Sequence, residues 1–217
     1  MAISRASPYI WVKWLAGIMS GDNPCHWQAW FLTKNQLREK QPSDFNLVAW
    51  KIDHSRMLAD LTKDLSRKVG VLVRTEYELK QPFNEFGATL AGKADCLCWD
   101  TTGLTVYDCK TGKERDSDQI QVMIYMWMLS KHSDFTSKNI RGEVVYTNRI
   151  QPIEKLPDDF EDNLNYFVKL LCDREAPMKS AGSPCKFCAI TKSDCPDRIE
   201  DDQSNKRTVL PGKGILS

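Results

Sequence analysis

The chain has 217 residues, of which 41% are hydrophobic and 27% charged, so it is long enough to bury the core of one substantial domain. Its net charge of +1 counts against a scaffold that binds nucleic acid over its whole surface, but it leaves room for a local groove. The apolar run Pro8–Met19 is too short to cross a bilayer and lacks the features of a signal peptide. We therefore expect no membrane partner and a cytoplasmic location, in a bacterial, archaeal or phage-infected cell.

Hydrophobic periodicity and chain breakers predict alternating helices and strands. Residues 8–37 are predicted to be helical with an interruption at Pro24, and a long helix over residues 44–69 is predicted with Ser43 or Asp44 as its cap. The elements expected after it are strands Val71–Leu79, Ala88–Trp99 and Leu104–Lys110, a helix from Asp116 or Ser117 to about Lys131, strand Arg141–Thr147 and helix Asp158–Asp173. This order predicts an α/β fold with a mixed central sheet flanked by helices.

The expected domain organisation follows from these elements. Residues 1–198 are predicted to form one domain, with an N-terminal helical segment over 1–43, a core over 44–155, and a C-terminal helix with a cysteine group over 156–198. The polar, breaker-rich residues 199–217 are expected to be a flexible tail.

Two acidic residues and a lysine lie on neighbouring predicted strands. Side chains alternate along a strand, so Asp108 and Lys110 share one face and Cys109 points to the other. A tight hairpin can bring Asp95 beside Asp108, and two converging carboxylates suit Mg²⁺ or Mn²⁺. A lysine at this position can orient the water that attacks a phosphate. Taken alone, the same Asp-x-Lys tripeptide is also compatible with a surface ion pair at a strand end.

The following helix carries Gln121 and Tyr125, which share one helical face because they are four residues apart. Both can reach toward the acidic pair or a DNA strand. The alternative is an amphipathic core helix in which Tyr125 is simply buried.

Together, Gly92-x-x-Asp95, Asp108-x-Lys110-Thr-Gly and Gln121-x-x-x-Tyr125 resemble the motifs of the RecB-like branch of the PD-(D/E)xK nucleases. The resemblance implies a restriction-endonuclease-like αβββαβ core. It implies a metal site built from Asp95, Asp108 and the backbone carbonyl of Cys109, with Lys110 catalytic.

The resemblance also implies a histidine ligand from the long helix, where His54 is placed. The sequence departs from the family because the glycine usual before that histidine is missing. His54 is also in register with Leu58 and Leu61, so a structural histidine on the core face stays open. Glu76, on the first strand, is expected to be a solvated glutamate that can add acidity near the site.

Eight cysteines in a chain without an export signal favour metal or cluster ligation over disulfides. Cys185, Cys188 and Cys195 form a Cys-x₂-Cys-x₆-Cys group that lacks a fourth thiolate. Cys25 is the natural candidate, and Cys172 is the alternative. A zinc ribbon normally uses two cysteine pairs, whereas a cubane cluster tolerates an isolated fourth ligand better.

AddB-type nuclease domains and the CRISPR-associated adaptation exonucleases bind a [4Fe–4S] cluster through one N-terminal and three C-terminal cysteines. The resemblance to them implies such a cluster here, joining the two ends of the chain, with zinc as the alternative. Cys96, Cys98 and Cys109 are expected to pack in the core as small apolar residues.

The function that this pattern predicts is hydrolysis of DNA by a metal-dependent nuclease, acting as an exonuclease on single-stranded or end-containing DNA. The alternative is a catalytically silent DNA-end-binding subunit of a recombination or CRISPR adaptation complex. Other protein partners and an oligomer are also compatible with the sequence.

The cations expected to contact DNA are Lys113, Arg115, Lys80 and Arg74. The N-terminal tryptophans are candidates for a channel, but most are expected in the core: Trp11, Trp14, Trp27 and Trp30.

Overall fold

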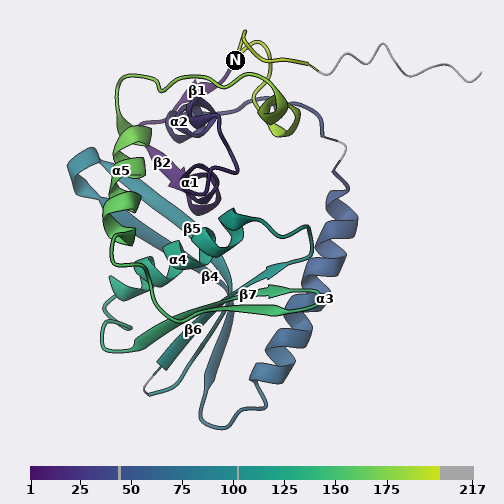
Figure 1. Cartoon of the computed structure of the whole chain (residues 1–217), viewed down its shortest axis with the longest axis vertical. Helices are drawn as coiled ribbons and strands as arrows, with labels where there is room; N and C mark the ends of the chain where they lie inside the picture. Colours follow the sequence, from purple (N-terminus) through teal and green to yellow (C-terminus); the bar gives the residue numbers. More distant parts are fainter. Residues whose placement is uncertain (44, 102, 201–217) are drawn as a thin grey trace, which may run out of the picture.

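The computed structural model of the protein describes residues 1–43, 45–101 and 103–200. Its main sheet has six strands, namely β2 (Tyr9–Trp11), β4 (Leu72–Phe83), β5 (Ala88–Trp99), β6 (Gly103–Lys110), β7 (Asn139–Tyr146) and β8 (Ile150–Ile153). The helices are α1 (Val12–Met19), α2 (His26–Lys34), α3 (Leu47–Leu65), α4 (Asp116–Ser130) and α5 (Phe160–Cys172) (Figure 1). Short strands β1 (Ile3–Ser4) and β3 (Asn35–Gln36) form a separate pair.

The sheet is mixed, as the sequence predicted. Strand β5 runs antiparallel to β4 and β6, whereas β6 and β7 are parallel and β8 returns antiparallel to β7. Strand β2 adds to β5 in parallel. The order from α3 to β7 is helix, three strands, helix, strand, which is the αβββαβ arrangement.

Two strands share one edge of β5. Strand β4 pairs with the opposite edge from Phe83 to Leu72, with an interruption at Glu76. On the shared edge, pairing with β2 ends at Ala91 and pairing with β6 begins at Cys96. Residues 92–95 therefore lie where the sheet forks, with no ladder partner on that edge within the described strands. Asp95 occupies this fork.

The two faces of the sheet bury different groups of side chains. The larger apolar cluster lies under α1, α4 and α5, and its sheet residues include Leu97, Val106 and Val144. The smaller cluster lies under α3 and includes Cys96 and Tyr107. Because neighbouring strand residues point to opposite faces, Cys96 and Leu97 serve different clusters. Figure 1 shows α3 on one side of the sheet and α1, α4 and α5 on the other.

Helix α3 begins later than predicted. Its N-cap is Asn46, whose side chain accepts a 3.0 Å hydrogen bond from the Ala49 amide, rather than Ser43. Asp44, the other predicted cap, lies outside the described residues. Leu58 and Leu61 pack on the smaller cluster, whereas the apolar side chains of the first turns of the helix are exposed.

The N-terminal helical prediction was wrong at both of its ends, where Tyr9–Trp11 form β2 and Asn35–Gln36 form β3, and a late strand was missed. Residues Tyr9–Trp11 form β2 and not the first turn of a helix, because pairing with the distant β5 outweighs their local helical pattern. Strand β8 contains Pro152 and only four residues, so its sequence carries little strand pattern.

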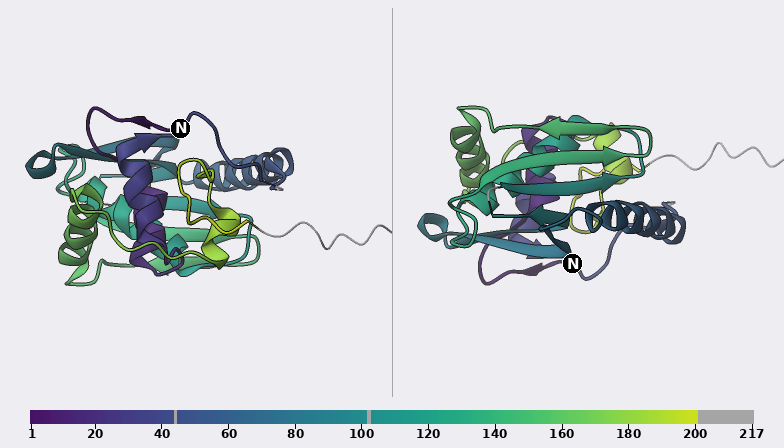
Figure 2. Two further views of the ribbon diagram at one scale, coloured as in Figure 1. Left: turned by 90° about the horizontal axis from the view of Figure 1, so that it is seen from above. Right: turned by 90° about the horizontal axis from the view of Figure 1, so that it is seen from below.

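The N- and C-terminal segments pack against each other. Trp27 and Leu32 of α2 form a third apolar cluster with Ile190. The Ala2 amide donates to the Asp194 carboxylate at 2.9 Å, and the Gln41 amide donates to the Ala189 carbonyl at 2.9 Å. Both views in Figure 2 place the C-terminal loop beside the N-terminal segment.

Of the predicted tail, residues 201–217 lie outside the described part of the chain. No helix among the described residues has the length and apolar character needed to cross a membrane.

Gly142 permits close packing between β7 and α4, which leads to a stability prediction. A Cβ atom there would collide with buried Val122 and approach Met126 Sδ to 2.8 Å. We expect Gly142→Ala to lower the free energy of unfolding by about 1–3 kcal/mol through overpacking. Chemical denaturation measures this change. Gly112→Ala, where a Cβ meets no described atom within 4 Å, is the matched control, and equal stability of the two variants would contradict the packing described.

Candidate functional site

A cleft of about 990 Å³ opens at the fork of the sheet. Its floor is formed by β5, β6 and α4, and its walls come from α1, α2, α3 and the loop that carries the C-terminal cysteines. Six of the predicted site residues line this cleft, namely His54, Asp95, Asp108, Cys109, Lys110 and Gln121. Tyr125 is not part of the lining and contacts Gln121 from below.

The Asp95 carboxylate takes the place of a missing ladder bond. Its Oδ2 accepts a 2.7 Å hydrogen bond from the Cys109 amide, across the gap where β5 and β6 separate. The same oxygen lies 3.0 Å from His54 Nε2. The prediction for His54 left two positions open, and the structure places it half-buried against Asp95 rather than inside the apolar cluster.

Asp108, Lys110 and Gln121 form one hydrogen-bonded group beside Asp95. Gln121 Nε2 donates to Asp108 Oδ1 at 2.9 Å, and Lys110 Nζ donates to Gln121 Oε1 at 3.0 Å. The Lys110 ammonium also lies 2.6 Å from Asp108 Oδ2. Asp108 is only 2% exposed, so this carboxylate depends on protein partners in place of water.

The electrostatics of the group follow from burial and mutual charge. Burial raises the pKa of Asp108, the positive charge of Lys110 opposes this shift, and the Asp95 charge adds to it. For Lys110, burial lowers the pKa, but the attraction of Asp108 and Asp118 outweighs it and the net shift is upward. The hydrogen bond to Asp95 raises the pKa of His54. Lys110 therefore carries its proton in this arrangement.

Comparison with known families agrees with this geometry. A family model described as the PD-(D/E)XK nuclease superfamily matches residues 26–196, which is most of the chain. The chain belongs to the PD-(D/E)XK nuclease superfamily. Among curated proteins, none matches this sequence.

A solved structure supports the same fold. The crystal structure of SSO0001 superposes with a TM-score of 0.52, covers 91% of each chain and shares 16% sequence identity. At this identity the likeness concerns the fold alone.

Members of the PD-(D/E)XK superfamily typically use Mg²⁺ or Mn²⁺, and the donor set at the fork fits such an ion. Asp108 Oδ2 is buried, and its close partner among the described residues is the Lys110 ammonium at 2.6 Å, so this oxygen is held inside the site and away from bulk water. Asp95 brings a second carboxylate, and oxygen-rich sites suit these cations. In the described chain, no three His, Cys, Asp or Glu side chains have the spacing to hold an ion, so the fit rests on the chemistry of the donors.

Tyr125 supports Gln121 from below. Its hydroxyl donates to the Lys93 carbonyl at 3.0 Å and lies 3.3 Å from Gln121 Nε2. Gly92 makes room for the ring, since a Cβ there would lie 2.7 Å from Tyr125 Cε1 and 2.7 Å from Val12 Cγ2. The glycine of the Gly-x-x-Asp motif is therefore needed for packing beside the site.

Sequence reasoning missed Asp118. It is buried at the start of α4, accepts a 3.0 Å hydrogen bond from the Arg115 amide, and has its Oδ1 3.8 Å from Lys110 Nζ. An acidic residue three positions after a helix cap is a known N-terminal pattern, and here the cap is Arg115 rather than Asp116 or Ser117. Asp118 adds negative charge behind Lys110.

Glu76 is a solvated strand residue, as predicted, because it belongs to β4 and its side chain is exposed. It faces the cleft, pairs with Lys93, and is opposite Asp95 in the β4–β5 register. Its φ of 55° is in the left-handed region, which interrupts the ladder at the level of the fork.

Two of the four cations predicted to contact DNA lie in the cleft. Lys113 and Arg115 line it, whereas Lys80 and Arg74 are not part of its lining. Lys80 and Arg74 belong to β4, and the Arg74 guanidinium lies 5.9 Å from the Trp99 ring centroid. A strand position alone did not reveal which edge faces the cleft.

Most of the N-terminal tryptophans pack in the core, as predicted. Trp27 is buried, and Trp14 and Trp30 are partly buried against the apolar clusters. Trp11 is the exposed member of the group.

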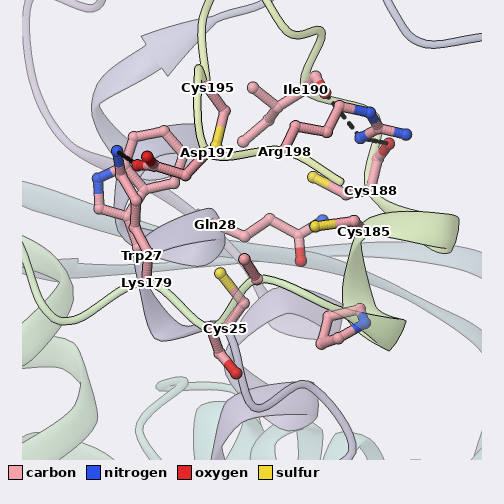
Figure 3. A pocket seen from close by; sticks show the side chains of 13 residues that line it. Cys25, Trp27, Gln28, Lys179, Cys185, Cys188, Ile190, Cys195, Asp197 and Arg198 are labelled. Carbon is pink, nitrogen blue, oxygen red and sulfur yellow. Dashed lines mark hydrogen bonds and ion pairs between the residues drawn. The ribbon is translucent and has the colours of Figure 1, made fainter. Parts of the chain in front are cut away.

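The four predicted ligand cysteines line one small cavity. Figure 3 shows the sulfur atoms of Cys25, Cys185, Cys188 and Cys195 turned toward its interior. All four are free thiols. Cys172 is not part of this lining and instead packs against the main core. Cys96, Cys98 and Cys109 lie in the apolar cluster under α3, as expected.

Loss of the Tyr125 hydroxyl tests the described support of Gln121. We expect Tyr125→Phe to lower the free energy of unfolding by about 1 kcal/mol, because the hydroxyl of this buried side chain donates to the Lys93 carbonyl and that hydrogen bond is lost. Thermal or urea denaturation measures the change. Tyr166→Phe, on the exposed face of α5, should have no effect beyond a few tenths of a kcal/mol. A Tyr125→Phe protein as stable as the wild type would show that the hydrogen bond is absent.

Proposed function

We propose that this protein is a metal-dependent deoxyribonuclease of the RecB-like branch, acting as an exonuclease on single-stranded or end-containing DNA. The observation that carries the proposal is the group at the fork of the sheet. Two carboxylates from separating strands lie beside a lysine that a glutamine holds in place, on the floor of an open cleft. A structural core has no need of a buried Asp108–Lys110 pair at such a position.

The residues proposed to hold Mg²⁺ or Mn²⁺ are Asp95, Asp108, His54 and the carbonyl of Cys109. When bound, such a cation lowers the pKa of a water ligand and stabilises negative charge on a phosphate. Asp95 contributes a carboxylate whose orientation is fixed by the Cys109 amide, and His54 meets the same carboxylate from α3.

Lys110 is proposed to act as a charged donor. Its raised pKa keeps Nζ protonated, so it can hydrogen-bond a phosphate oxygen or orient a water molecule next to Asp108. Gln121 restrains Nζ through Oε1, and Tyr125 in turn restrains Gln121. The contacts from Tyr125 to Gln121 and from Gln121 to Lys110 thus fix the position of the ammonium.

The four cysteines are proposed to bind a [4Fe–4S] cluster. Four free thiols from Cys25 and from the C-terminal group line one cavity, which is the donor set that such a cluster takes. Bound there, the cluster would link α2 to the C-terminal loop across a long stretch of chain. Its role would be to stabilise the folded wall of the cleft.

The activity test compares the wild type with Lys110→Ala on end-labelled single-stranded and duplex DNA. We expect cleavage with Mn²⁺ or Mg²⁺, no cleavage with EDTA, and a rate reduced by roughly 10²–10⁴-fold in the variant. Lys63→Ala removes an exposed lysine near the end of α3 and should retain the full rate. A folded wild type that cuts neither substrate with either metal would refute the nuclease and leave a DNA-end-binding subunit.

The cluster test measures iron and acid-labile sulfide in protein purified without oxygen. We expect about four of each per chain in the wild type and in Cys172→Ser, and a large loss in Cys25→Ser. Zinc in stoichiometric amount, with no iron, would contradict the cluster assignment and leave the four cysteines as a zinc site. Equal iron in Cys25→Ser and the wild type would exclude Cys25 as a ligand.

A further inference from the structure

Two exposed aromatic side chains line the cleft from segments far apart in the sequence. Trp50 belongs to α3 and is 38% exposed, and Phe187 belongs to the cysteine loop and is 81% exposed. Neither is a member of the apolar clusters formed by the described residues. Large apolar rings left in an open cleft indicate a surface that contacts a ligand.

Trp50 lies one helical turn before His54. The two rings are stacked, with centroids 5.0 Å apart and planes inclined by 28°. Since His54 faces Asp95, this stacking places the indole next to the acidic pair. Phe45 also approaches the indole at an angle, with centroids 6.3 Å apart and planes inclined by 53°. The Trp50 side chain remains partly exposed and lines the cleft.

The lining of the same cleft also carries positive charge that no described carboxylate pairs with. Its carboxylates are Asp22, Glu76, Asp95, Asp108 and Asp118, and each has a partner within the described chain. Lys13, Lys51 and Lys113 line the same cleft without an ion pair to any described carboxylate.

Burial is the main cause of the lowered pKa of Lys13, and the neighbouring positive charges of Lys40 and Lys110 lower it further. Because Lys13, Lys51 and Lys113 have no carboxylate partner among the described residues, the cleft lining carries an excess of positive charge. An anionic polymer would neutralise that excess.

We propose that Trp50 and Phe187 are base-stacking positions that make unpaired DNA the preferred form in the cleft. This inference rests on the proposed function and names the substrate form that the site selects. An unpaired strand exposes the faces of its bases to aromatic rings, whereas the bases of a duplex stack on each other. The unpaired lysines bind the backbone of either form, and the rings discriminate between them.

Binding is measured without cleavage, by fluorescence anisotropy of a labelled oligothymidine and of a blunt duplex of equal length, in Ca²⁺, with intact substrate verified on a gel. We expect Trp50→Leu and Phe187→Leu each to weaken binding of the single strand roughly tenfold or more, with a much smaller change for the duplex. Trp50→Phe should recover most of the affinity because it restores an aromatic face. Trp11→Leu is the matched control, since Trp11 is also 38% exposed but lies outside the cleft lining.

Unchanged single-strand affinity in both leucine variants, or equal losses for single strand and duplex, would overturn the stacking proposal. Circular dichroism verifies folding, and should Trp50→Leu fail to fold, Phe187→Leu and Trp50→Phe against Trp50→Gln carry the same comparison. A wild type that prefers the single strand but cuts no DNA would refute the nuclease and leave the stacking positions intact. A wild type that cuts DNA while the leucine variants keep its preference would refute the stacking positions alone.

Discussion

The carboxylate of Asp95 completes the sheet at the point where β5 exchanges one neighbour for another. Strand β2 leaves β5 at Ala91 and β6 joins it at Cys96, so the Cys109 amide would lose its acceptor at this level. Asp95 supplies that acceptor at 2.7 Å and thereby becomes fixed beside Asp108. The fork that interrupts the backbone ladder also opens the cleft. The integrity of the sheet and the position of the acidic pair therefore both depend on the hydrogen bond from the Cys109 amide to Asp95.

Supporting residues hold the fork from both faces of the sheet. On one face, Gln121 and Tyr125 of α4 link Lys110 to the backbone of β5, in space that Gly92 leaves free. From α3 on the opposite side, His54 meets Asp95. A polar group this enclosed is stable only when its members satisfy one another, which constrains each residue type at these positions.

Sequence patterns predicted the parts of this arrangement that depend on local order. Side-chain alternation placed Asp108 and Lys110 on one face, a hairpin placed Asp95 nearby, and helical spacing paired Gln121 with Tyr125. The fork itself could not be predicted, because it depends on Tyr9–Trp11 pairing with β5 far along the chain. Trp50 and Phe187 carry no motif, and only the folded chain brings them to one cleft.

The central claim is that Asp95, at the fork of the sheet, is part of a metal site. Direct titration of Mn²⁺ into the protein, followed by calorimetry, tests this claim. Asp95→Asn keeps an oxygen that can accept the Cys109 amide, so it preserves the sheet while it removes one carboxylate charge. The account predicts that the wild type binds Mn²⁺ at this site and that the variant, with unchanged stability, loses the binding. Equal Mn²⁺ affinity and stoichiometry in the two proteins would contradict a metal site built on Asp95.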